Sequence, residues 1–165
     1  MAGDLRSEAQ GADLAALVVA RLTAGGATVA VAESLTGGLL AAALTSVPGA
    51  SAVVRGGVVA YATDLKAALL GVDAALLDRV GPVDSEVAAA MARGARRALS
   101  ATYGLATTGE AGPDSASGQQ VGTVHLAVSG PAGDEVASLV VDGDRAAVRD
   151  GAVAGALDLL GRLLA

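Results

Sequence analysis

The chain is 165 residues long, which is enough for one domain of ordinary size with a substantial buried core. Its 11 basic and 17 acidic side chains give a formal net charge of −6, so neither nucleic acid nor an anionic membrane surface is an expected partner. The absence of cysteine and the presence of a single histidine exclude disulfides, thiol nucleophiles, thiolate metal sites and any site that needs two imidazole rings.

The N-terminal half of the sequence alternates between helical and extended patterns. Residues 1–10 are expected to be a flexible lead-in without the apolar segment of a secretory signal, which makes the cytoplasm the expected location. Apolar periodicity and glycine stops predict helices at residues 13–24, from 38 to about 45, and from about 63 onward. Runs rich in valine and alanine predict strands at 28–32 and 53–61, the second with a bulge or close approach at its two glycines.

The segment 34–54 carries no charge and is long enough to raise the question of a membrane span. Glycines, Pro48 and several hydroxyl side chains interrupt it, so a turn, a short helix and a second turn are expected there. We therefore expect no association with a membrane.

The C-terminal half predicts a long helix, three strands and a last helix. The long helix runs from residue 84 to about 98, with acids at its start and arginines towards its end, as the helix dipole favours. A strand at 105–108 precedes the loop 109–120, which is rich in small polar residues and expected to be mobile. Strands at 121–128 and 136–141 are expected to pair in antiparallel fashion, and Asp144 caps the last helix.

Helices and strands that alternate and then end in a hairpin favour an α/β fold. We expect a single three-layer domain over residues 1–165, in which helices cover both faces of a mixed β-sheet. Ligands of such sheets bind beyond the carboxyl ends of the strands. This rule predicts a site at the turns after Ala32, Tyr61 and Thr108, because each follows a predicted strand and carries hydroxyl, glycine or carboxylate residues.

Lys66 is the only lysine among the eleven basic side chains. An arginine guanidinium stays protonated at any working pH, whereas a buried ammonium can lose its proton and act as a base. Lys66 is therefore a candidate general base, with an ordinary solvated lysine as the alternative. Tyr61 closes a strand five residues earlier, so both side chains can reach one site across the junction; inside one continuous helix they would point about 140° apart.

Hydroxyl side chains lie in two turns, at Ser34 with Thr36 and at Ser51. A neutral lysine can activate a serine where histidine is lacking, and the single His125 lies in an alternating pattern that favours an ordinary strand side chain. To act near neutral pH, the lysine needs its pKa lowered from about 10.4 to roughly 7 or 8, by burial or by a neighbouring cation such as Arg55.

Five segments, taken in order, resemble the motifs of the CinA carboxy-terminal domain family. They are AESLTGG at residues 32–38, PGAS at 48–51, YATDLK at 61–66, TGEAGP at 108–113 and VGTV at 121–124. The ordered set covers nearly the whole chain from about residue 13 and is more specific than any single segment. The resemblance implies hydrolysis of nicotinamide mononucleotide to nicotinate mononucleotide and ammonia, in pyridine nucleotide salvage.

The resemblance also implies a Ser/Lys site without metal or organic cofactor. Ser51 resembles the nucleophile, with Ser34 as the alternative, while Lys66 resembles its base and Tyr61 a proton relay or orienting hydroxyl. Further residues implied to line the site are Ser34, Thr108 and, as the substrate-binding arginine, Arg145. The expected partner is a small-molecule nucleotide, and the expected assembly is a homo-oligomer, taken as a dimer.

The turn at Thr36, Gly37 and Gly38 has two candidate uses as part of the substrate-binding site. Its backbone amides can stabilise an oxyanion, or they can hold the nucleotide phosphate at a helix start. The alternative is a tight strand-to-helix connection that binds nothing. For Arg145, the alternative is a surface arginine paired with a neighbouring aspartate.

Three positions depart from the family pattern. Glu110 stands in place of a small apolar residue, Gln120 in place of a proline, and Leu35 in place of a cysteine. An acid at the start of the loop 109–120 can repel a phosphate or point outward, which leaves two alternatives open: a catalytically silent nucleotide-binding or partner-binding module, and a hydrolase of another amide. Glu33, at a strand end, is either buried near the site or solvated.

Overall fold

A computed structural model describes residues 2–165 of the chain, with side chains from residue 11 onward. The helices are α1 (Ala2–Ala24), α2 (Leu39–Thr45), α3 (Thr63–Leu70), α4 (Ala74–Val80), α5 (Ser85–Ala98) and α6 (Arg145–Leu163), with a 3-10 helix η1 (Ala50–Ala52). The strands are β1 (Val29–Glu33), β2 (Val54–Val59), β3 (Tyr103–Gly109), β4 (Thr123–Gly130) and β5 (Gly133–Val140). The sequence patterns predicted each of these elements except α4 and η1, although they placed the start of the first helix at residue 13.

The structure describes only the backbone of residues 2–10 in the segment 1–10, where the sequence predicts a flexible lead-in. Met1 and the side chains of residues 2–10 lie outside the described residues, and the backbone of residues 2–10 continues α1 towards the N-terminus. None of the helices within residues 2–165 combines the length and the apolar character that crossing a bilayer requires.

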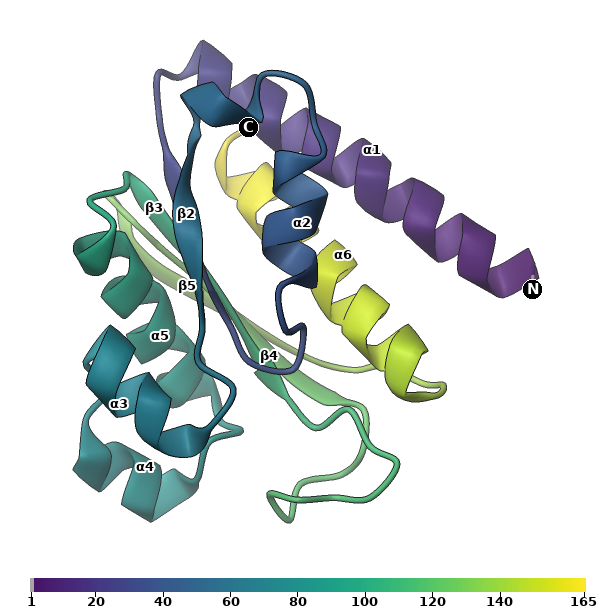
Figure 1. Cartoon of the computed structure of the whole chain (residues 1–165), viewed down its shortest axis with the longest axis vertical. Coiled ribbons are helices and arrows are strands. Elements are labelled where there is room, and N and C mark those ends of the chain that lie inside the picture. The colour runs from purple at the N-terminus through teal and green to yellow at the C-terminus, as the bar shows by residue number, and fades with distance from the viewer. Residues whose placement is uncertain (1) are drawn as a thin grey trace.

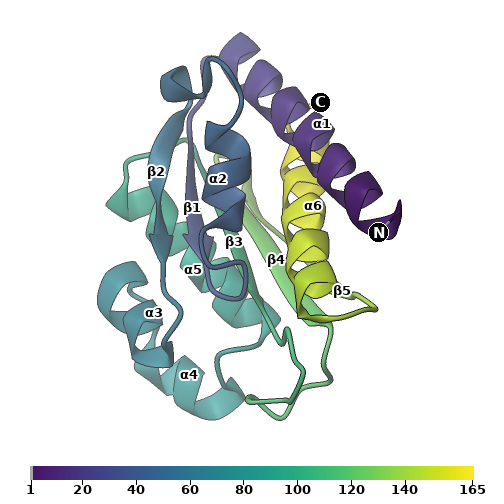
Figure 2. The same cartoon turned by 45° about the vertical axis from the view of Figure 1, so that its right-hand side comes forward.

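The five strands form one sheet (Figure 1), and their order is β2-β1-β3-β4-β5, as the labels in Figure 2 show. Strands β2, β1 and β3 run parallel, whereas β4 pairs antiparallel with both β3 and β5. The predictions of a mixed sheet and of an antiparallel pair near the C-terminus are therefore confirmed. The turn between β4 and β5 is short, with Gly130 opposite Gly133 in the register of the two strands.

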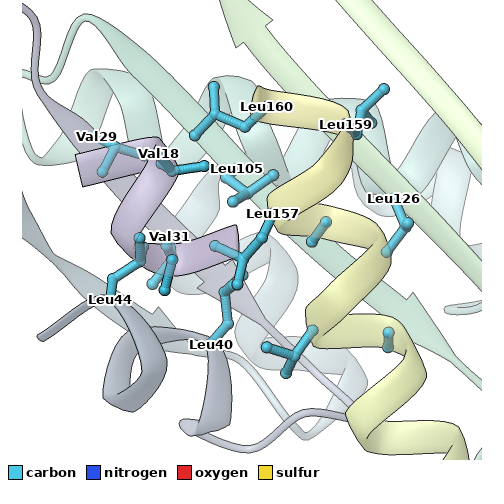
Figure 3. Packing of buried hydrophobic residues seen from close by; sticks show 14 of the residues in the cluster. Val18, Val29, Val31, Leu40, Leu44, Leu105, Leu126, Leu157, Leu159 and Leu160 are labelled. Atoms are coloured by element: carbon cyan, nitrogen blue, oxygen red, sulfur yellow. The ribbon is translucent and has the colours of Figure 1, made fainter. Parts of the chain in front are cut away.

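Helices cover both faces of the sheet, as predicted. Figure 2 shows α1, α2 and α6 on one face and α3, α4 and α5 on the other. The first face holds the larger aliphatic core, in which Leu157 of α6 lies close to Leu40 of α2 and to Leu105 of β3 (Figure 3). The second core is built mostly from alanine, with Met91 of α5 among its larger members. Small side chains there let α5 lie close to the sheet.

The glycine pair of β2 produces the irregularity that the sequence predicted. Val29 pairs with Val54 and Ala30 with Gly56, so the register skips Arg55. A Cβ on Gly57 would lie 2.6 Å from a methyl group of Val31, so the neighbouring strand leaves no room for a side chain there.

The carboxyl ends of the three parallel strands meet at one edge of the sheet. Glu33 at the end of β1 pairs with Val59 of β2 and with Thr107 of β3. Hydrogen bonds continue one residue further, because the Ser34 amide donates to the Thr107 carbonyl (3.0 Å) and the Ala60 amide donates to the Glu33 carbonyl (2.8 Å). The segments after β1, β2 and β3 are thereby held side by side.

Candidate active site

Glu33 positions the turn between β1 and α2. Its side chain is fully buried, and its two carboxyl oxygens accept hydrogen bonds from the amides of Gly38, Leu40 and Ala41 at 2.9 to 3.0 Å. These amides lie at the start of α2, where a helix offers no carbonyl acceptor for its first N–H groups. The buried alternative considered for Glu33 is therefore correct, and its contacts hold Ser34, the next residue, at the end of β1.

Lys66 lies at the centre of the site. This side chain, the sole lysine of the chain, is only 1% exposed. Its Nζ lies 3.0 Å from the Oγ of Ser34, 2.8 Å from the carbonyl oxygen of Ala60 and 3.5 Å from the carbonyl oxygen of Tyr61. The strand-to-helix junction between β2 and α3 thus brings the Lys66 amine to the serine that follows β1.

Burial lowers the pKa of Lys66 from 10.5 to about 8. A charged ammonium is disfavoured there because it loses the solvation that water provides, and the groups around Nζ are carbonyls and a hydroxyl rather than carboxylates. The expected neighbouring cation plays no part. Arg55 lies at the amino end of β2 and donates to the carbonyl of Leu99.

The prediction that Ser51 pairs with Lys66 is wrong. Ser51 is exposed on η1, before β2 begins, whereas Lys66 follows β2. The six residues of β2 extend over about 20 Å at roughly 3.3 Å per residue, so the two side chains lie at opposite ends of that strand. Ser34, the alternative serine, is the one that contacts the Lys66 amine.

A pocket of about 410 Å³ opens in front of Ser34 and Lys66. Its lining residues are Ser34, Leu35, Tyr61, Thr63, Lys66, Pro82, Val83, Gly109, Glu110, Ala111, Ala116, Ser117 and Arg145. Pro82 and Val83, between α4 and α5, carried no sequence signal, and nor did Ala116 and Ser117. These four residues join the pocket lining because the segments that carry them fold against the edge of the sheet.

Tyr61 and Arg145 form one side of this pocket. The Arg145 guanidinium donates to the Tyr61 hydroxyl (2.9 Å) and to the Gly112 carbonyl (2.7 Å). Arg145 is the first residue of α6, and the Asp144 side chain caps that helix by accepting from the Ala147 amide. The structure therefore brings Arg145 into the lining with Ser34, Tyr61 and Lys66 instead of pairing it with an aspartate.

Thr36, Gly37, Gly38 and Thr108 are not among the residues that line the pocket. The buried Thr36 hydroxyl pairs with that of Thr107 (2.8 Å), the Gly37 amide donates to the Ser34 carbonyl, and the Gly38 amide is taken by Glu33. The prediction that the Gly37 and Gly38 amides bind substrate is wrong, because both amides already have acceptors within the turn, as a tight strand-to-helix connection requires. The Thr36 amide has no acceptor in the part of the chain that the structure describes, so it stays a candidate donor to substrate.

Thr108 supports the pocket from outside its lining. Its buried hydroxyl donates to the carbonyl of Pro82 (2.7 Å). Successive residues of β3 face opposite sides of the sheet, so Thr108 faces away from the side on which Thr107 contacts Thr36. Thr108 therefore holds the segment that supplies Pro82 and Val83 to the pocket, and the prediction that it lines the site itself is wrong.

His125 is an ordinary strand residue, as the alternating pattern indicated. Its Nδ1 lies 2.8 Å from the Ser138 hydroxyl on the neighbouring strand, and it is not part of the pocket lining. Burial lowers its pKa, although the charge of Asp84 acts in the opposite direction. Within the residues that the structure describes, His, Asp and Glu side chains form no group of three that could hold a metal ion.

The chain is similar to one set of proteins along almost its whole length. The model of the CinA C-terminal domain matches residues 11–164. A CinA-like protein from Frankia casuarinae is 55% identical over 157 residues, which cover 94% of this chain and 36% of that protein. The chain thus spans about a third of the length of the curated relatives it matches.

Solved structures agree with this result. A competence/damage inducible protein from Agrobacterium tumefaciens is 39% identical, with a TM-score of 0.87 over 93% of this chain and 95% of that chain. A CinA superfamily protein from Klebsiella pneumoniae is 32% identical, with a TM-score of 0.90 over 93% of this chain and 97% of that chain. The motif-based resemblance is confirmed: the chain belongs to the CinA C-terminal domain family.

Proposed function

We propose that this protein is an amidohydrolase that converts nicotinamide mononucleotide to nicotinate mononucleotide and ammonia. The observation that carries the proposal is the 3.0 Å contact between the buried Lys66 amine and the Ser34 hydroxyl at the wall of a pocket. A lysine of lowered pKa beside a serine is a known arrangement for covalent amide hydrolysis. Membership of the CinA family, with the motif resemblance described above, supports the choice of substrate.

The surroundings of Lys66 suit a neutral amine that acts as a base. A neutral amine has two N–H donors and one lone pair. The carbonyls of Ala60 and Tyr61 can only accept, so they take the two N–H groups and leave the lone pair to accept the proton of the Ser34 hydroxyl. The contacts therefore orient Lys66 for removing the proton of Ser34 as its oxygen attacks the carboxamide carbon.

The remaining steps follow from this arrangement. Attack forms a bond between Ser34 Oγ and the amide carbon, and the carbonyl electrons move to its oxygen. The Leu35 and Thr36 amides, which come directly after Ser34 and have no acceptor in the part of the chain that the structure describes, are the proposed donors to this oxyanion. Collapse breaks the C–N bond, Lys66 returns its proton to the leaving nitrogen, and ammonia departs. Water then hydrolyses the ester, again with Lys66 as base, and releases the carboxylate product.

Arg145 is the proposed partner of the nucleotide phosphate. A guanidinium has five N–H donors, and Arg145 donates one hydrogen bond each to Tyr61 and Gly112. Tyr61 is 58% exposed, so its ring is open to a ligand in the pocket.

The test is an assay of ammonia release from purified protein with nicotinamide mononucleotide, nicotinamide riboside and free nicotinamide. We expect ammonia and nicotinate mononucleotide in equal amounts from the mononucleotide, and slower release from the two compounds without phosphate. Tight mononucleotide binding by calorimetry without turnover would contradict the proposal and favour the silent binding module. Release from a different amide alone would favour another hydrolase.

The pH dependence of the reaction should report the ionisation of Lys66. Because the base must be neutral and its pKa is about 8, kcat/KM should rise about tenfold per pH unit below pH 8 and level off above it. The range pH 6.7 to 9.5 avoids the second phosphate ionisation near pH 6. The Tyr61→Phe variant is the control, because it keeps Lys66 and should keep the same midpoint. A flat profile, or a midpoint above pH 10, would contradict the assignment of Lys66 as the base.

A further inference from the structure

Glu110 places a negative charge in the wall of the pocket. It comes directly after β3, is only 7% exposed and lines the same pocket as Ser34, Lys66 and Arg145. Within the described residues it is the one acidic side chain of that lining.

The loop that follows β3 holds the carboxylate of Glu110 in a fixed position. One oxygen, Oε2, accepts from the amides of Ala116 (3.0 Å) and Ser117 (2.8 Å) and from the Ser117 hydroxyl (2.7 Å). A rotation of the side chain would leave these three donors without their acceptor. Glu110 is therefore preorganised, and the loop is tied to the pocket wall through it.

The second carboxylate oxygen, Oε1, is open. Every fully buried side-chain nitrogen or oxygen among the described residues has a hydrogen-bond partner, and none of the donors in that part of the chain reaches Oε1. Oε1 is thus not fully buried, and it belongs to a side chain that lines the pocket. It has no protein hydrogen bond to give up when a ligand binds there.

The carboxyl group is ionised at neutral pH. Burial alone would raise the pKa of Glu110, but the hydrogen bonds from Ser117 and Ala116 and the positive charge of Arg145 outweigh that effect and hold the pKa below its ordinary value. The pocket therefore presents a fixed anion at Glu110 and a fixed cation at Arg145.

We propose, on the basis of the function proposed above, that Glu110 is a specificity residue that selects substrates with a positively charged ring. A pyridinium nucleotide carries a cationic ring and an anionic phosphate, so its two charges complement Glu110 and Arg145 respectively. A pocket with the arginine alone would bind the phosphate but would not distinguish a cationic ring from a neutral ring of the same shape.

The experiment compares nicotinamide mononucleotide with its reduced 1,4-dihydro form, which has nearly the same size but an uncharged ring. Dissociation constants are measured by calorimetry in Ser34→Ala, where no turnover occurs, and in Ser34→Ala/Glu110→Gln. The Ser34→Ala protein should bind the cationic form at least about tenfold more tightly, and Glu110→Gln should remove most of that preference by weakening only the cationic ligand. Glutamine keeps a carbonyl oxygen for the three loop donors, so the fold should persist.

Two single variants in the same Ser34→Ala background separate charge from loop position. Asp114→Asn removes the same charge from an exposed side chain of the same loop outside the lining, and should change the preference less than twofold. Ser117→Ala removes a loop contact while keeping the Glu110 charge, and should retain most of the preference.

Three results would overturn the proposal: equal binding of both ring forms by the Ser34→Ala protein, an equal loss for both forms in Glu110→Gln, or a full loss of preference in Ser117→Ala. The first needs no Glu110 variant, so the proposal stays testable if Glu110→Gln fails to fold. Binding does not depend on catalysis. A preference for the cationic ring without any ammonia release by the wild type would refute the deamidase activity and support the role of Glu110. Ammonia release without that preference would support the deamidase activity and refute the role of Glu110.

Discussion

Replacing Ser34 by alanine, or Lys66 by methionine, should reduce kcat for ammonia release from nicotinamide mononucleotide by at least about 10³-fold. The two groups act as one unit, so the double variant should be no slower than either single variant. Lys66→Arg should be equally inactive, because a guanidinium keeps the positive charge but cannot lose its proton to serve as a base. Initial rates with a sensitive ammonia assay would measure all four proteins.

Ser51→Ala is the matched control for this series. It removes the same hydroxyl from the serine that the motif resemblance favoured, but that serine is exposed at the other end of β2. Its kcat should stay within about twofold of the wild type. An inactive Ser51→Ala protein beside an active Ser34→Ala protein would refute the proposed roles, provided that circular dichroism shows both to be folded.

The second large effect is expected on stability. Glu33→Ala should lower the free energy of unfolding by about 3 to 5 kcal/mol, because three amides at the start of α2 lose their acceptor and a buried side chain is truncated. The free energy of unfolding of Glu33→Gln should lie between those of the wild type and Glu33→Ala, since the glutamine amide nitrogen would face a backbone N–H that needs an acceptor. Urea titration would measure the difference, and the melting temperature should fall by roughly 10 °C.

Glu86→Gln provides the comparison on another helix. Glu86 also lies in the first turn of a helix, but its side chain is 61% exposed and pairs with an exposed arginine. That substitution should change the free energy of unfolding by less than about 0.5 kcal/mol. If Glu33→Ala cost less than 1 kcal/mol, the carboxyl group would not be what holds the turn in place.

Local pattern was sufficient for much of the fold. The predicted strand at residues 28–32 corresponds to β1 (Val29–Glu33), and the helix predicted from residue 84 to about 98 corresponds to α5 (Ser85–Ala98). Both have strong signals: a β-branched run in the first case, and a capping aspartate with an apolar face in the second. Helix α4 was missed, since it is seven residues long and lies in a segment where helical periodicity is too short to stand out.

The site was predicted less completely than the fold. Lys66 was identified because it is the only lysine, and Tyr61 because its spacing crosses a strand-to-helix junction. The three hydrogen bonds that Glu33 accepts, and those that join Glu110 to the loop, depend on how the backbone of each turn folds back on itself. Sequence spacing carries little information on such contacts, because the amides involved are common to all residues.

Composition and motif order by themselves determined the class of fold, the family and the amine that acts as the candidate base. The tertiary structure decided which serine that amine contacts, because Ser34 and Lys66 are 32 residues apart in the chain and meet only through the parallel pairing of β1 with β2. Parallel pairing places the ends of both strands at one edge of the sheet, whereas Ser51, closer to Lys66 in sequence, is held at the opposite edge by the length of β2.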